Sequence, residues 1–393
     1  MPAILEPHPR ITYLVPVFVL IFMVFAGVSS ADTGLLNILV QTEAVVAAII
    51  IMVSIVAVQI TSSAYTARVI GLFKNSPDFW GVVILYSATI IFTVYTLQTG
   101  GSGTYIAICY ILGVLCFAVL IPYTYIFTTM LSPSAIYKAL SKKITVKTIL
   151  DPDDPIQPLT DMVHTSMMKY HYETARNTIK AIGAALCDIL MQESALKGKE
   201  KDKNKDKIKA KNKINKEKEI SKRIFDHFSR ISTFAATQKN EHLLIITIET
   251  IDTIRDIASE KDFKEITTTT IDIINDIGKK AVNNTLEKAA TKAITSLSAF
   301  TIVLLQGEYI PEAVIVLGYI NDIGKISLKK SLKEPLHQEI FQLKDIGDIA
   351  KEKDLKFILT VTKNYLESLH YATRKKDAMA SQWCASILEK LKE

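Results

Sequence analysis

Four long apolar runs fill the first third of the chain and restrict its fold more than any other feature. Each has about 18 residues or more, enough to cross a hydrocarbon core of about 30 Å as a helix. Almost all of the charge follows residue 131. The sequence therefore predicts an all-α protein, with a four-helix transmembrane domain over residues 1–131 and a cytoplasmic α-helical domain after it. The expected spans are about residues 11–30, 35–63, 79–97 and 105–130.

The first run has a second interpretation. It follows Arg10 and ends at the small residues Ser29, Ser30 and Ala31, a pattern that is also typical of a cleaved signal peptide. Because the run is longer than the usual apolar core of a signal peptide, we favour a retained helix. Cleavage would leave the orientation of the other runs unchanged, since the second run would still start outside.

Basic residues predict the orientation. Cytoplasmic loops carry an excess of Lys and Arg, and with four spans the basic residues of this region all fall on one side. The other side carries Asp32 and the uncharged hairpin at 98–103. We therefore expect a multi-pass protein of the plasma membrane with both termini in the cytoplasm. The basic residues are Arg10, Arg68, Lys74, Lys138, Lys142, Lys143 and Lys147.

Polar residues on and after the second run are candidates for a membrane pathway or for coupling to the cytoplasmic domain. Glu43 is the one ionisable residue expected inside the hydrocarbon, where a carboxylate is a functional candidate; the alternative is a solvated position among the headgroups. Gln59 fits either an interhelical hydrogen bond or part of a path. Ser62, Ser63 and Arg68 fit a coupling point or a plain interfacial anchor.

Small and hydroxyl residues recur at helical spacing on the last three runs. Such stripes let helices approach closely, so packing is the simpler interpretation and a pore lining is the alternative. The stripes are Ala47, Ser54, Ala57 and Thr61 on the second run, Thr89, Thr93 and Thr96 on the third, and Cys109, Gly113 and Cys116 on the fourth.

A family resemblance rests on three short segments, at residues 13–16, 35–38 and 54–73, and most specifically on the glutamine, paired serines, aromatic residue and arginine from Gln59 to Arg68. Over residues 13–98 the chain resembles a widespread prokaryotic family of predicted membrane proteins, the domain of unknown function two-two-five-four. The chain departs from the family's pattern in two places: Ala67 stands where the family usually has a proline, and residues 168–173 stand where it has a Ser-Pro-Gly-Ile-Asn-Asp-Pro-like segment. The resemblance implies an integral membrane protein and no known reaction.

The segment after the membrane runs contains a connector and a boundary. Ser132 followed by Pro133 predicts a helix start, and residues 132–150 read as an amphipathic connector helix. The proline-rich residues 151–158 read as a solvated linker rather than a metal site. Residues 151–195 form the expected cytoplasmic helical segment, with one helix from 160 to 195. Its His164 and His171 are seven apart, not the three or four residues of a two-histidine metal site.

A lysine-rich segment at 196–223 carries the basic charge of the chain. It holds 13 Lys and Arg against five Asp and Glu, a net +8, so the rest of the chain is near −2 within a total of +6. With few apolar residues it cannot bury a core, and we expect a flexible, solvated insertion. Contact with anionic lipid is an alternative. Nucleic acid is not favoured as a partner, because no aromatic residues are interleaved with the lysines.

Residues 224–393 contain an internal repeat. The hexapeptide Ile-Asn-Asp-Ile-Gly-Lys at 274–279 recurs at 320–325, a shift of about 46 residues, and residues 254–266 return in similar form at 346–358, twice that shift. Each unit reads as helix, turn, helix, with turns at Ser259, Gly307 and Lys351. This period is typical of HEAT or armadillo helical pairs stacked into a solenoid.

No catalytic motif accompanies these features. The chain has no GxSxG, HExxH, Walker or dinucleotide fingerprint, and its four cysteines have no metal-binding spacing. We therefore expect no enzyme, metal or cofactor. The leading hypothesis is a membrane-anchored binding or scaffold protein whose helical repeats engage a protein partner. The alternative is a homo-oligomeric channel or transporter with the second span, including Glu43 and Gln59, at the pathway.

Overall fold

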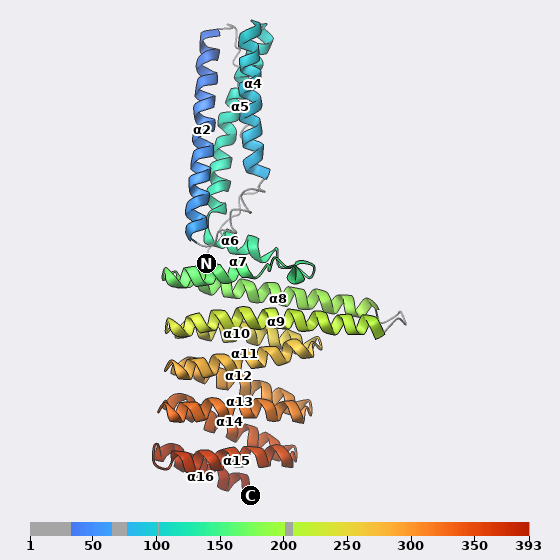
Figure 1. The fold of residues 1–393 in the computed structure, drawn as a ribbon, viewed down its shortest axis with the longest axis vertical. Coiled ribbons are helices and arrows are strands. Elements are labelled where there is room, and N and C mark those ends of the chain that lie inside the picture. Colours follow the sequence, from blue (N-terminus) through green and yellow to red (C-terminus); the bar gives the residue numbers. More distant parts are fainter. Residues whose placement is uncertain (1–32, 65–76, 101, 201–206, 393) are drawn as a thin grey trace. The chain divides into compact units, whose positions relative to one another are not determined.

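The computed structural model describes residues 33–64, 77–100, 102–200 and 207–392. The expected first span at 11–30 and Arg68 lie outside these residues. The described secondary structure consists of 14 α-helices and one 3-10 helix, with no strand among these residues, which confirms the all-α prediction. The chain divides into two compact units, one up to Ala139 and one from Leu140 onward (Figure 1).

The described part of the first unit contains three long helices, and each packs against the other two. They are α2 (Thr33–Ala64), α4 (Pro77–Thr99) and α5 (Gly103–Met130). They match the last three expected spans to within about two residues, the uncertainty of any helix boundary. All three are long and apolar enough to cross a membrane, as is α12 (Glu287–Gln306) of the second unit. Helix α5 continues through Pro122.

The first unit places hydroxyl groups inside and aliphatic side chains outside. Thr89, Thr93 and Thr96 of α4 are buried, whereas Ile84 and Ile91 of the same helix are about two-thirds exposed. All three buried threonines donate hydrogen bonds to carbonyl oxygens of their own helix. The threonine stripe of α4 therefore lies between the helices, as close packing requires.

The connector is shorter than predicted. Ser132 accepts a hydrogen bond from Ala135 N at 3.3 Å, as expected of an N-cap, but helix α6 (Pro133–Ser141) ends well before residue 150. Beyond it, Thr145 and Thr148 hydrogen-bond to each other, and Thr148 Oγ1 also donates to Lys143 O. These side chains offer the backbone an alternative to the helix. Only a single 3-10 turn, η2 (Thr148–Leu150), follows.

The second unit is a stack of helices in two layers (Figure 1). Each helix contacts the next member of its own layer, and from α9 onward each also contacts its successor in the chain. One layer contains α8 (Tyr172–Glu200), α10 (Glu241–Glu260), α12, α14 (Lys333–Glu352) and α16 (Ala378–Lys392). The other contains α7 (Gln157–Met168), α9 (Lys207–Thr237), α11 (Lys264–Asn283), α13 (Ile310–Lys329) and α15 (Lys356–Thr373). We call this stack the array.

The turns of the array share one construction. A residue with positive φ recurs every 23 residues, and the amide after it donates to the carbonyl five residues back, as in Phe263 N to Ala258 O at 2.8 Å. This is the Schellman arrangement, here built without glycine. The 46-residue sequence repeat is therefore two such intervals. The positive-φ residues are Lys239, Asp262, Thr285, Glu308, Ser331 and Asp354.

Two sequence boundaries need correction. The expected helix at 160–195 is two helices, because Tyr170 adopts positive φ and His171 N bonds to Ser166 O at 2.8 Å, so His164 and His171 do not share a helix. The array also begins before residue 224. Ile220 and Ile224 of α9 are both buried, so the last part of the expected flexible insertion is packed.

Candidate functional site

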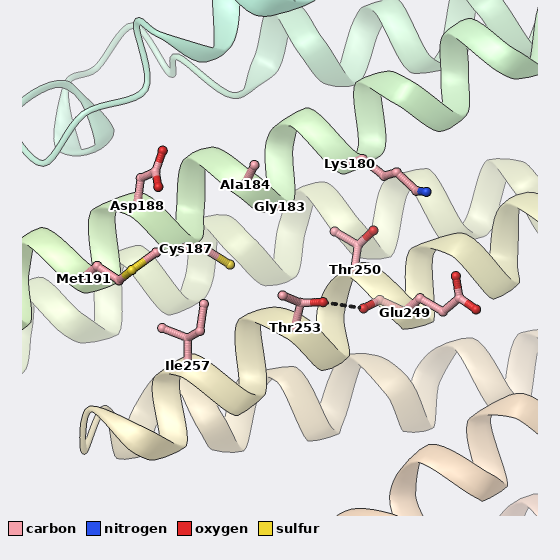
Figure 2. A pocket seen from close by; sticks show the side chains of 10 residues that line it. All are labelled: Lys180, Gly183, Ala184, Cys187, Asp188, Met191, Glu249, Thr250, Thr253 and Ile257. Carbon is pink, nitrogen blue, oxygen red and sulfur yellow. Dashed lines mark hydrogen bonds between the residues drawn. The ribbon is translucent and has the colours of Figure 1, made fainter. Parts of the chain in front are cut away.

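A groove lies between α8 and α10 (Figure 2). Gly183 brings the two helices together, since a Cβ there would overlap the Thr250 side chain. Beside this contact the surface opens into a hollow of about 490 Å³. Its apolar lining comes from Ala184, Cys187, Met191 and Ile257.

Charged side chains frame the groove. Lys180 and Asp188 stand on α8, and Glu249 stands on α10. The hydroxyls of Thr250 and Thr253 already donate to helix carbonyls, so their oxygens are left as acceptors. Cys187 is a free, buried thiol whose pKa is raised to about 11, mainly by burial. It is therefore a poor nucleophile.

A second cluster ties the proline-rich linker to α9. His227 Nε2 lies 2.6 Å from Asp154 Oδ2, and its Nδ1 lies 2.9 Å from Thr160 Oγ1. Arg223 and Arg230, one turn to either side on α9, donate to Asp151 O and to Gln157 Oε1 at 2.8 and 2.7 Å. The linker was expected to be solvated. Residues 151–153 are exposed, but Ile156 and Pro158 are buried and Asp154 bonds to His227, so only its first part is solvated.

This cluster is structural despite its order of Thr, His and Asp. Thr160 is fully buried and His227 is 2% exposed, so neither can meet a substrate. Burial alone would raise the pKa of Asp154, but the hydrogen bonds from His227 and Ile156 N and the charges of His227 and Arg223 together outweigh it and hold that pKa below its ordinary value. Sequence reasoning missed the pair because 73 residues separate its members. The available signal was the basic stripe at 223, 227 and 230.

The first unit contains a polar seam along α2. Its buried residues recur at intervals of seven or four, as Leu36, Glu43, Ile50, Ser54 and Thr61. Such spacing keeps one face of a helix against its neighbours. Glu43 lies on this face and is 0% exposed.

The Glu43 carboxyl packs against Gly113 of α5. Its Oε1 is 2.6 Å from the place that a Cβ on residue 113 would occupy, and the methyl groups of Leu39 lie beside it. Among the described residues, neither oxygen of Glu43 has a hydrogen-bond partner. The glycine therefore supplies the space that the carboxyl occupies.

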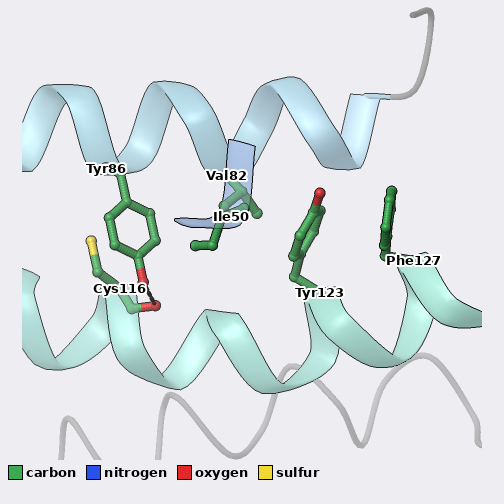
Figure 3. Packing of buried hydrophobic residues seen from close by; sticks show 6 residues of the cluster. All are labelled: Ile50, Val82, Tyr86, Cys116, Tyr123 and Phe127. Carbon is green, nitrogen blue, oxygen red and sulfur yellow. Dashed lines mark hydrogen bonds between the residues drawn. The ribbon is translucent and has the colours of Figure 1, made fainter. Parts of the chain in front are cut away.

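The polar seam continues beyond Gly113 along α5, where Figure 3 shows Cys116 and Tyr123 beside Tyr86 of α4. Tyr86 OH donates to Cys116 O at 3.0 Å, and the Cys116 thiol contacts Thr89 Oγ1 at 3.4 Å. Further along, Ser54 and Tyr123 share a hydrogen bond of 2.8 Å. All three helices thus contribute polar groups to one internal line.

The other expected site residues lie apart from Glu43. Gln59 is exposed, and 16 residues of helix separate it from Glu43 by about 24 Å. Ser62 is half-buried, and the exposed Ser63 donates to Ile60 O at 2.9 Å. The described structure therefore does not bring Glu43 and Gln59 into one site. Their functional roles stay predictions.

Comparison with known proteins gives little to transfer. No family model matches the chain, so the resemblance to a membrane-protein family stays a prediction, and no curated protein matches it either. A solved structure described as a circular tandem repeat protein with novel repeat topology and enhanced subunit contact surfaces aligns over 96% of each chain, at 10% identity and a TM-score of 0.27. Neither a family nor an activity follows from these values. Among the described residues, no group of three or more His, Cys, Asp or Glu could hold a metal.

Proposed function

We propose that this chain is a membrane-anchored binding protein whose helical array engages a protein partner in the cytoplasm. The observation that carries the proposal is the inverted polarity of the first unit. In an ordinary soluble bundle the aliphatic side chains turn inward. Here Ile38, Met52 and Ile91 are more than 60% exposed, while Glu43 and a line of hydroxyl groups are enclosed.

The bilayer is the solvent that suits this surface. Helices satisfy their own backbone hydrogen bonds, and lipid tails cover aliphatic side chains without cost. Close packing across small residues then holds the helices together. The positive-inside pattern supports a cytoplasmic position for the array.

The array supports a binding role. Its paired helices with a 46-residue period resemble HEAT or armadillo units, and such arrays present extended surfaces rather than catalytic centres. The groove at Gly183 offers an apolar floor of binding-site size inside a charged frame. We assign partner contact to this groove.

Photo-crosslinking in cells tests the assignment. A photoreactive residue replaces Met191, which is 46% exposed in the groove, and separately Met379, which is 55% exposed on α16 of the same layer. We expect a discrete protein adduct at position 191, weakened by Ile257→Glu, and none at 379. Equal adducts at both positions, or none at either, would contradict partner contact in the groove. Release of the chain from membranes at alkaline pH would separately contradict the anchor.

A channel or transporter is the second candidate. The specific observation that favours it is the enclosed Glu43 carboxyl, which has no hydrogen-bond partner among the described residues. A scaffold would not need such a group. Ion flux through liposomes that Glu43→Ala alters would favour this candidate over a pure scaffold.

A further inference from the structure

We propose that Glu43 is a proton-binding site within the three-helix bundle, at which a single carboxyl takes up and releases a proton. This inference rests on the proposed membrane placement of α2, α4 and α5. Glu43 is 0% exposed, and neither of its oxygens is hydrogen-bonded to a described residue. A charged, unpaired carboxylate is very costly in such surroundings, whereas a neutral acid is tolerated.

The packing of the bundle leaves a space that fits this carboxyl. The Oε1 atom occupies the space left by the missing side chain of Gly113, with Leu39 packed on the same glycine. Even an alanine at 113 would force the carboxyl to move, since the contact would be only 2.6 Å. A packing residue in this seam would not need an ionisable group, because Ile50 fills the equivalent position one heptad along α2.

The surroundings favour a proton over a metal cation. Sodium, calcium and magnesium ions need about six oxygen ligands, and one carboxylate supplies two. No group of three or more His, Cys, Asp or Glu accompanies Glu43 among the described residues.

Polar groups continue from this position along α5. Gly113 and Cys116 are one turn apart on its buried face, and the Tyr86 hydroxyl is bonded to Cys116 O. Two further turns along, Tyr123 and Ser54 share a hydrogen bond. The seam therefore places hydroxyl groups from Tyr86 to Ser54 between Glu43 and the end of α2 at Ala64.

Labelling with dicyclohexylcarbodiimide tests the proposal on the full chain in liposomes. The reagent reacts with a neutral carboxyl in an apolar site: the acid proton moves to one nitrogen, the carboxyl oxygen bonds to the central carbon, and the acyl group then shifts to the nitrogen as a stable N-acylurea. We expect one adduct on the peptide containing Glu43, formed more slowly as the pH rises. It should be lost in Glu43→Gln and kept in Glu339→Gln, which changes a fully buried glutamate of the array.

Infrared difference spectra between acid and alkaline samples give a second readout that needs no reagent access. Because the array holds a second buried carboxyl, at Glu339, the spectra are compared in a Glu339→Gln background. A protonated-carboxyl band that disappears at alkaline pH in this background, and is missing when Glu43→Gln is added, supports the proposal. Protection of the adduct by sodium ions would overturn the proton assignment in favour of a cation. Absence of both adduct and band would overturn the site itself. If the chain stays in membranes at alkaline pH while both signals are missing, only this inference fails and the membrane anchor stands.

Discussion

The Glu339 carboxyl on α14 lies directly against Gly324 on α13, where any Cβ would overlap it. One sequence repeat earlier the equivalent residues are Gly278 and Ala293, and a Cβ on residue 278 would lie 3.1 Å from that of Ala293. The two helix crossings are otherwise similar, but the later one has a carboxyl group where the earlier one has a methyl group. Glu339 is 0% exposed, and neither oxygen has a hydrogen-bond partner among the described residues.

The first prediction concerns this crossing. Gly324→Ala should destabilise the α13–α14 pair by about 1–3 kcal/mol, because the added methyl group overpacks the site. In a Glu339→Ala background the same change should cost less or become stabilising, since alanine favours a helix by about 1 kcal/mol over glycine. Amide hydrogen exchange of α13 and α14 measures both effects. Additive free energies in the double-mutant cycle would contradict the contact.

The second prediction concerns pH. Burial raises the pKa of Glu339 well above its ordinary value of 4.5, although Lys325 partly opposes the shift. The folded state therefore holds a proton that the unfolded state releases above about pH 4.5, so this group stabilises folding in acid and loses that contribution as the pH rises. We expect Glu339→Gln to gain stability relative to the wild type with rising pH, by at most about 1.4 kcal/mol per pH unit. A constant difference in unfolding free energy across the pH range would refute this.

The third prediction concerns the linker clamp. Asp154→Asn removes a charged hydrogen bond to a buried histidine and should destabilise the start of the array by about 1.5–3 kcal/mol, at the lower end because Asp154 is 27% exposed. Because the folded pKa of Asp154 lies below the ordinary 3.8, its contribution persists above that pH and disappears only in stronger acid. Hydrogen exchange in α7 and α9 reports the loss. The exposed neighbour Asp153→Asn is the matched control and should leave both helices unchanged.

The fourth prediction concerns the turns. Thr285 is β-branched and has φ of 61°, a left-handed conformation that costs about 1 kcal/mol for residues other than glycine. Thr285→Gly should therefore stabilise the array by about 0.5–1 kcal/mol. Asn283→Gly, two residues earlier and still within α11, should have the opposite sign. Thermal unfolding measures the stability change in both variants. Stability changes of the same sign would show that the turn stores no strain.

These turns also show what sequence could and could not predict. The 46-residue repeat was visible because the hexapeptide at 274–279 recurs unchanged. The 23-residue interval was hidden because its marker is a backbone angle adopted by Lys, Asp, Thr, Glu and Ser in turn. An apolar residue follows most of these positions, as Phe263, Leu286 and Leu332 do, and that pairing was the usable signal.

The candidate sites also differ in how far the sequence predicts them. The seam of the first unit was predictable, because small and hydroxyl residues at helical spacing mark a close helix contact. The position of Glu43 on that seam follows from its seven-residue distance to the buried Leu36 and Ile50. The exposure of Gln59 follows from the same spacing. The contact between Asp154 and His227 depends on the packing of helices distant in sequence, which no local pattern encodes.

The turn interval leads to a last prediction about the lysine-rich segment. One interval before Lys239 is Lys216, and one more is Glu193; these two residues form an ion pair between α8 and α9. The separation of these two residues equals one 23-residue turn interval. The lysine-rich segment is therefore one extra interval, inserted at a position where the pattern would place a turn. Deletion of residues 194–216, with Glu193→Gly and Glu217→Leu to supply the turn, should leave hydrogen-exchange protection of α10–α16 intact. The lost ion pair and the bond from Glu265 N to Glu217 should together cost about 1 kcal/mol.

Binding of the chain to anionic vesicles should fall in the same deletion variant, since each lysine near such a surface contributes about 1 kcal/mol. Replacement of the lysines at 197–213 by glutamine, which keeps the length and leaves the acidic residues in place, should weaken vesicle binding at least as much. Loss of protection in α10 on deletion would show that the segment is needed for folding.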